Sequence, residues 1–174
     1  MKAVEERLKG AFEGSEFDGL REHVDVVLSS EGLRIEFGEG LIGDATFASG
    51  SAKMTVPMLR AITILGGEIA ALPHDVIIEG HTDGVPLQRA GGYSNWELSS
   101  DRANAARRAL QGQGVAPGRI ASVRGLADRY PKISDFPMDP RNRRISVLLP
   151  FRATVASAPP ADAAIAADTS ADTR

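Results

Sequence analysis

The chain has 174 residues, of which 43% are apolar and only 5% aromatic, so it can bury one ordinary core made mainly of aliphatic side chains. Its 20 basic and 23 acidic residues give a formal net charge of −3, so it lacks the global positive charge that drives nucleic-acid binding, and no nucleic-acid partner is expected. The absence of cysteine excludes disulfides, Cys-ligated metals and thiol nucleophiles.

Residues 1–19 predict a short amphipathic helix. Val4, Leu8 and Phe12 recur every four residues among charged side chains, while Gly10 and Gly14 weaken the helix. A stripe this narrow needs a partner surface, so residues 1–20 are interpreted as a linker helix that packs on the domain or on a second copy. This beginning is too charged for a signal peptide, and no stretch of about 20 apolar residues that could span a membrane is present.

Two strand-like runs follow and predict a β-hairpin. Apolar residues alternate with polar ones around Val24, Val26 and Leu28, and again over residues 33–37. Residues 29–32 between them have the composition of a turn.

A helix is predicted after a loop over residues 38–51. Its buried face is a set of apolar residues three or four positions apart, Leu59, Ile62, Leu65, Ile69 and Leu72, with Pro57 in the first turns. Residues 76–80 form a nearly continuous apolar run, which is typical of a central strand.

Ser94 and Glu97 match a capping box and predict a second long helix that runs to about residue 111. Its buried side is expected to include Ala103, Ala106 and Leu110, while Arg107 and Arg108 face water. Residues 120–124 predict a third central strand, and residues 145–149 a last strand.

The order of these elements predicts an α/β (α+β) two-layer sandwich, in which a mixed β-sheet carries helices on one face. We assign residues 21–152 to this domain. Residues 153–174 are rich in alanine and lack aliphatic periodicity, so they are predicted to be a flexible tail.

The most informative stretch runs from Glu79 to Arg108. Asp83 emerges at the carboxyl end of a predicted strand, where open α/β sheets place binding groups, and Arg102 lies about two turns into the helix that follows. An Asp and an Arg held close together suit a ligand that carries an ammonium and a carboxylate on one carbon. On spacing alone, a structural salt bridge between Asp83 and Arg102 is the simpler interpretation.

Other side chains of this region suggest weaker hypotheses. His74, Asp75, His81 and Asp83 invite a metal site, but their spacing matches no recognisable zinc ligand set, and no cofactor is expected. Three serines, Ser94, Ser99 and Ser100, lack the Gly-x-Ser-x-Gly elbow of a hydrolase and are interpreted as caps and helix surface.

The run Arg141-Asn142-Arg143-Arg144 has two interpretations. It is either a solvated basic turn or a local positive rim that receives an acidic ligand. Trp96 is interpreted as packing at the helix start, with ligand stacking as the alternative.

Several motifs in the right order resemble the OmpA-like peptidoglycan-binding domain. They are Gly80-His81-Thr82-Asp83, Leu98-Ser99, Arg102-Ala103, Gly125 and Asn142-Arg143-Arg144, with Phe47 to Ala52 similar to the first loop of that family. Residues 92–99 and 101–105 are closer still to its MotB branch. The resemblance covers about residues 33–149.

The resemblance implies non-enzymatic binding of peptidoglycan through the diaminopimelate residue of its stem peptide. It places the Asp of the family on Asp83 and the Arg on Arg102, which favours the ligand over the salt bridge. The predicted binding residues are Asp83, Arg102, Thr82, Asn142, Arg144 and Phe47.

The MotB branch further implies a homodimer that anchors a flagellar motor stator together with a MotA-type subunit. The chain would then be the periplasmic domain of an inner-membrane protein, a fragment whose membrane segment lies upstream. Residues 1–30 would regulate anchoring by packing on the domain or on a second copy. Two alternatives are an OmpA/Pal-type outer-membrane anchor and a wall hydrolase, for which the sequence offers no credible catalytic set.

Overall fold

The alternating apolar pattern near the beginning of the domain forms the predicted hairpin. The computed structural model describes residues 1–13, 23–39 and 46–151, and within them strand β1 (Val24–Leu28) pairs antiparallel with β2 (Gly32–Gly38). Ser29 Oγ accepts hydrogen bonds from the backbone N–H groups of Glu31 and Gly32 in the turn. Gly32 has a φ of +151°, and a Cβ there would overlap the carbonyl oxygen of Leu149, so the turn requires glycine.

The remaining strands extend this hairpin into one mixed, five-stranded sheet. Strand β5 (Arg144–Pro150) lies between β2 and β3 (Val76–His81) and is antiparallel to both, while β4 (Ile120–Gly125) is parallel to β3. The sheet order is therefore β1-β2-β5-β3-β4. Residues 76–80 are central, as predicted, but among the described strands residues 120–124 form an edge strand that pairs with β3. None of the six residues of β4 is fully buried, since four are half-buried and two are exposed, as an edge position allows.

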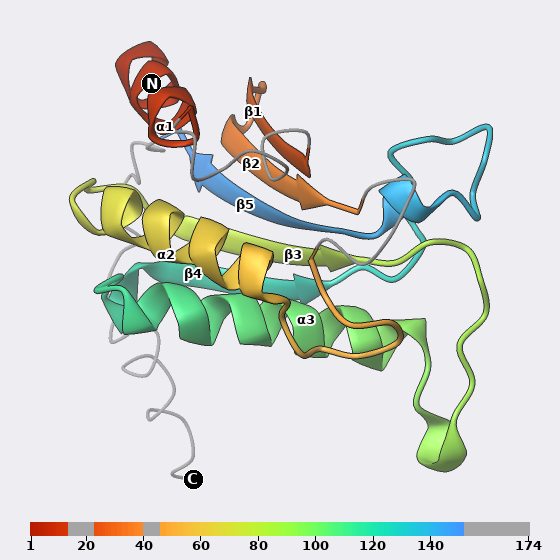
Figure 1. Ribbon diagram of the computed structural model, residues 1–174. Coiled ribbons are helices and arrows are strands. Elements are labelled where there is room, and N and C mark those ends of the chain that lie inside the picture. The colour runs from red at the N-terminus through yellow and green to blue at the C-terminus, as the bar shows by residue number, and fades with distance from the viewer. Residues whose placement is uncertain (14–22, 40–45, 152–174) are drawn as a thin grey trace, which may run out of the picture.

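Three helices pack on this sheet and complete the predicted two-layer α+β architecture. In Figure 1, α2 (Val56–Ala70) and α3 (Asn95–Gly112) lie side by side in front of the strands, and α1 (Lys2–Ala11) contacts β1 and α2. Short 3-10 helices cover Ala90–Gly92, Pro117–Arg119 and Pro140–Asn142. Among the described helices, none is long and apolar enough to cross a lipid bilayer.

The start of helix α2 is set by an N-cap residue and a proline. Thr55 is its N-cap and accepts a hydrogen bond from the backbone N–H of Met58, and Pro57 lies in the first turn. The buried face contains Ile62, Leu65 and Ile69 as predicted. Leu59 is 47% exposed, so its assignment to that face was wrong; the adjacent Met58 is buried instead.

Helix α1 belongs to the same hydrophobic core as the rest of the domain. Leu8 is fully buried, and the Phe12 ring packs edge-on against the Phe37 ring with 6.2 Å between their centroids. Arg7 of α1 also pairs with Glu68 of α2. The helix ends at Ala11, earlier than the predicted Gly19; residues 14–22 and the predicted tail 153–174 lie outside the described residues.

The sheet face opposite the helices carries polar and charged side chains. Strand alternation directs Arg34 and Glu36 of β2, Arg144 of β5 and Glu79 of β3 to this face. Arg34 and Arg124 donate to the two carboxylate oxygens of Glu79 at 2.6 and 2.9 Å. Burial alone would raise the pKa of Glu79, but the hydrogen bond and charge of Arg34 lower it overall, so Glu79 stays ionised.

His81 is buried on this charged face without a hydrogen-bond partner for either ring nitrogen among the described residues. The pKa of His81 is lowered to about 4, first by burial and then by the charge of Arg144, while the charges of Glu79 and Glu36 oppose this shift. These surroundings favour a neutral imidazole, so His81 is interpreted as a structural residue of the buried sheet. Among the described residues, no group of three or more His, Asp or Glu side chains could hold a metal ion.

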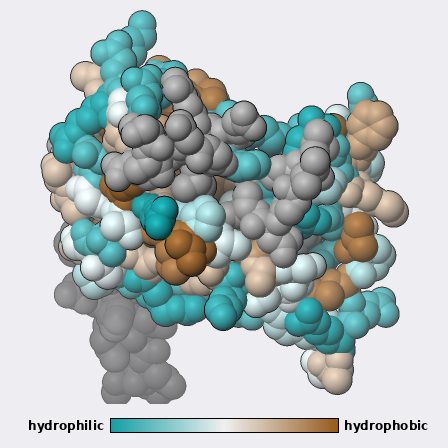
Figure 2. Space-filling model, viewed as in Figure 1, coloured by the Kyte–Doolittle hydropathy of each residue, from teal (hydrophilic) through white to brown (hydrophobic). Residues whose placement is uncertain are grey.

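Hydrophobic and hydrophilic side chains are mixed on the described surface in view. In Figure 2, the hydrophobic surface of this face is divided into separate patches by hydrophilic side chains. The exposed large apolar residues include Val27, Val56 and Leu59, which belong to β1 and α2. Single exposed apolar side chains of this kind are normal on folded proteins.

The neutral state of His81 makes the free energy of unfolding depend on pH. Because its pKa is about 4 in the folded chain and about 6.5 when unfolded, the unfolded chain binds more protons between these values. The contribution is complete above about pH 6.5 and is lost as the pH falls towards 4, by roughly 3 kcal/mol at most. Urea unfolding at a series of pH values should show this loss in the wild type and not in His81→Leu; an equal pH slope in both proteins would contradict it.

Candidate functional site

A pocket of about 200 Å³ lies where strand β3 leaves the sheet. Thr82 and Asp83 follow the last residue of β3, and Arg102 reaches the same pocket from α3. The side chains that line it come from four separate segments of the chain: Phe47, Ser49, Gly50, Thr82, Asp83, Val85, Pro86, Leu87, Asn95, Leu98, Arg102 and Arg143. The opposite charges of Asp83 and Arg102 are therefore brought together by the fold and not by their spacing in the sequence.

The capping box at the start of α3 sets the position of Arg102 along the helix. Ser94 Oγ accepts a hydrogen bond from the N–H of Trp96, and Glu97 Oε2 accepts one from the N–H of Ser94 at 2.8 Å, as predicted. The start of the helix is thereby fixed about two turns before Arg102. Trp96 itself is 45% exposed, and the guanidinium of Arg129 lies over its ring, so its predicted packing role is limited to the surface.

Two glycines allow α3 to lie directly on the strands. A Cβ at Gly80 of β3 would overlap the carbonyl oxygen of Ser99, and a Cβ at Gly125 of β4 would overlap Ser100. Ser99 is fully buried, donates to the carbonyl of Trp96, and accepts a hydrogen bond from the N–H of Ala127 at 3.1 Å. This contact fixes the distance between the end of β3 and the helix, and with it the width of the pocket.

Asp83 makes hydrogen bonds through both carboxylate oxygens. Oδ1 accepts from the N–H of Val85 at 3.1 Å, and Oδ2 accepts from Nη1 of Arg143 at 2.9 Å. Its side chain is only 9% exposed. Among the described residues, the ion pair of Asp83 is therefore with Arg143, and the salt bridge with Arg102 that spacing alone suggested does not form.

Arg102 is fixed in the pocket wall by the segment that precedes α2. It is 3% exposed, its Nε donates to the carbonyl of Ser51 at 2.8 Å, and its guanidinium carbon lies 5.0 Å from the centroid of the Phe47 ring. Phe47 is itself buried and forms an antiparallel bridge with Met54. The structure thus brings Phe47, Thr82, Asp83 and Arg102 to one pocket.

Asn142 and Arg144 do not line this pocket, although they were expected to lie in the same groove. Asn142 is fully buried; its Oδ1 accepts from the N–H of Ile133, and its Nδ2 donates to the carbonyls of Phe136 and Pro137. It holds the loop whose Pro137 carbonyl accepts a hydrogen bond from Gly84 next to Asp83. Arg144 lies on the opposite sheet face, where it pairs with Glu36 and the carbonyl of Tyr130.

Arg143 lines the pocket in place of Asn142 and Arg144, and the alternation of side chains along β5 could have indicated this. Ile145 and Val147 face the helices, and because strand side chains alternate, Arg143 is directed to the same side and Arg144 to the other. Arg141 points elsewhere again and pairs with Asp139. The basic run is therefore neither a free basic turn nor one continuous positive rim, since each arginine has its own acidic partner.

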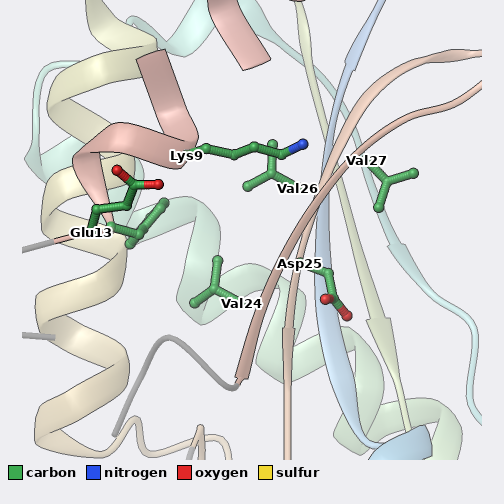
Figure 3. A pocket seen from close by; sticks show the side chains of 7 residues that line it. Lys9, Glu13, Val24, Asp25, Val26 and Val27 are labelled. Carbon is green, nitrogen blue, oxygen red and sulfur yellow. The ribbon is translucent and has the colours of Figure 1, made fainter. Parts of the chain in front are cut away.

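A larger hollow of about 280 Å³ lies between α1 and β1 (Figure 3). It is lined by Lys9 of α1, by Phe12 and Glu13 just after this helix, and by Val24, Asp25, Val26 and Val27 of β1. Lys9 is ion-paired with Glu5 of its own helix at 2.6 Å. Asp25 is likewise paired, with Lys132. Because both Lys9 and Asp25 pair with side chains outside the hollow, the pocket at Asp83 is the better candidate site.

Comparisons with known proteins agree with this fold. A sequence model of the OmpA family matches residues 46–144, which include every predicted binding residue. Motility protein B of Escherichia coli (strain K12) is 37% identical over 131 residues, which make up 75% of this chain and 42% of that protein. The chain thus spans less than half of the length of that relative.

Two solved structures share the fold at lower sequence identity. A putative MotB-like protein from Desulfovibrio vulgaris has a TM-score of 0.71 and 21% identity, covering 87% of this chain and 94% of that one. The periplasmic domain of Helicobacter pylori MotB has a TM-score of 0.62 and 20% identity, covering 74% and 89%.

The close contact at Gly80 can be tested by adding one methyl group. Gly80→Ala should lower the free energy of unfolding by about 1–3 kcal/mol, because α3 has to move away from β3. Gly67→Ala is the matched control: Gly67 lies exposed in α2 with open space around it, and alanine favours helices, so stability should stay equal or rise. Equal stability of Gly80→Ala and the wild type in urea unfolding would show that this contact does not set the helix position.

Proposed function

We propose that the pocket at Asp83 and Arg102 binds peptidoglycan and leaves the peptidoglycan chemically unchanged. This chain belongs to the OmpA family, whose sequence model matches residues 46–144. The observation that carries this proposal is the convergence of a carboxylate and a guanidinium from distant segments on one pocket, within the matched family region. Asp83 leaves the end of β3 and Arg102 comes from the middle of α3.

The ligand that suits this arrangement carries an ammonium and a carboxylate on one carbon. We propose that it is the free end of the diaminopimelate residue in the peptidoglycan stem peptide. Its carboxylate would bind the fixed guanidinium of Arg102, and its ammonium would bind the Oδ2 side of Asp83. Thr82, whose buried Oγ1 lacks a hydrogen-bond partner among the described residues, adds a polar atom to the same wall.

Binding without catalysis is supported by the composition of the pocket. Among the described residues that line it, the hydroxyl groups are those of Ser49 and Thr82, and no histidine is present that could act as their general base. The charged side chains are Asp83, Arg102 and Arg143, which suit recognition of a charged ligand. We therefore propose an anchor and not a wall hydrolase.

The relatives named Motility protein B support a role in a flagellar motor stator. We propose that this chain is the periplasmic part of an inner-membrane stator subunit and that it fixes the stator to the cell wall. A homodimer and a MotA-type partner, joined through a membrane segment beyond this chain, belong to the same proposal. The OmpA/Pal type of outer-membrane anchor would use the same pocket but has less support among these relatives.

An anchor of this kind can tolerate weak single contacts. Two charge-assisted contacts contribute about 1.5–3 kcal/mol each. After the cost of ordering the ligand, this corresponds to an affinity of roughly millimolar order for one site. Two copies that bind one polymer, and many stators that share the load, raise the effective affinity without new contacts.

Replacing either charged residue tests the proposal. Asp83→Asn and Arg102→Gln should each weaken binding to purified peptidoglycan by roughly tenfold or more, because each removes one charge-assisted contact. The measurement is co-sedimentation with insoluble peptidoglycan, with circular dichroism to verify the fold. Incubation should release no soluble wall fragments.

The chain offers matched controls for both variants. Asp75→Asn changes an exposed carboxylate just before the other end of β3, and Arg108→Gln changes an exposed guanidinium on α3. Both should sediment like the wild type. Full binding by the Asp83 and Arg102 variants would remove these residues from the binding site, and fragment release that depends on either would indicate an enzyme.

A further inference from the structure

Arg143 occupies the position that the pocket offers to a cation. Its Nη1 donates to Oδ2 of Asp83 at 2.9 Å, while the backbone N–H of Val85 already holds Oδ1 at 3.1 Å. The Asp83 side chain is only 9% exposed. An ammonium that enters the pocket therefore has to share Oδ2 with a guanidinium or displace it, and two cations on one oxygen repel each other.

The surroundings of Arg143 favour displacement over sharing. Its backbone is fixed, because its N–H donates to the carbonyl of Pro140 and its own carbonyl accepts from Glu39, both within the described residues. Its side chain, in contrast, is 29% exposed, three times the exposure of the Asp83 side chain. A long, flexible arginine stem at the rim can move its charged end into water while the backbone stays in place.

We propose that Arg143 is an internal competitor for the cation position at Asp83 and so determines which ligands the pocket accepts. The proposal rests on the proposed function, in which Asp83 receives the ammonium of a diaminopimelate end. A ligand with its own ammonium replaces the guanidinium and restores the neutralised state of Asp83. A ligand that carries a carboxylate alone leaves the ion pair intact and gains nothing from Asp83.

The competing role predicts an increase in affinity when Arg143 is lost. If Arg143 instead provided a second arm for the ligand carboxylate, beside Arg102, its loss would weaken binding. The two roles thus give opposite signs for the same substitution. The increase should be roughly threefold to tenfold, because a partly exposed ion pair is modest in strength.

The test is a titration of the folded chain with free meso-diaminopimelate, followed by NMR at low salt. Arg143→Gln should bind more tightly than the wild type by the stated factor, whereas Arg143→Lys, which keeps a cation beside Asp83, should stay close to the wild type. Arg141→Gln is the matched control, since its guanidinium pairs with Asp139 at 2.7 Å and not with Asp83. Weaker or unchanged binding by Arg143→Gln would overturn the proposal.

Two further measurements keep this result distinct from the proposed function. Asp83→Asn should weaken binding by roughly tenfold or more whether or not Arg143 competes, so undiminished binding there would contradict the proposed function itself. If Arg143→Gln does not fold, the wild type can be observed directly through the ¹⁵N signals of the Arg143 guanidinium. Saturation with meso-diaminopimelate should speed up the exchange of these protons; continued protection would mean that the ion pair with Asp83 persists and that Arg143 does not compete.

Discussion

The contact between helix α3 and the strands β3 and β4 is the constraint on which the pocket depends. Gly80 and Gly125 leave no room for a side chain beneath Ser99 and Ser100, so the helix lies directly on the sheet at the point where β3 ends. Ser99 then joins the helix to the loop after β4 through the N–H of Ala127. A carboxylate at a strand end and a guanidinium two turns into a helix share one pocket because this contact holds both elements.

Local patterns predicted the elements well, because hydrophobic periodicity and capping are local. The hairpin, the capping box at Ser94 and the last strand formed as expected. Sheet order was harder to predict: residues 120–124 were expected at the centre of the sheet but lie at an edge, since strand pairing is decided by the whole fold. The resemblance brought Asp83 and Arg102 correctly to one pocket, whereas Asn142 and Arg144 lie elsewhere, because motif order carries no information on which sheet face a side chain occupies.

The pocket combines fixed and adjustable charges. Arg102 is buried, bonded to the Ser51 carbonyl and stacked on Phe47, so its guanidinium position is determined before any ligand arrives. The Arg143 side chain is paired with Asp83 and remains partly exposed. A rigid anion-binding arm beside an exchangeable cation suits reversible binding of a zwitterionic group, and the weak affinity that results fits an anchor with many attachment points.

The most direct measurement is backbone NMR of the ¹⁵N-labelled chain during addition of a soluble muropeptide that contains diaminopimelate. Binding at the proposed pocket should shift the amide signals of residues 82–85, of Ser51 and of the α3 segment around Arg102, and leave α1 and β1 unchanged. Shifts confined to the hollow between α1 and β1, or no shifts at millimolar concentrations, would contradict a wall-binding role for this pocket.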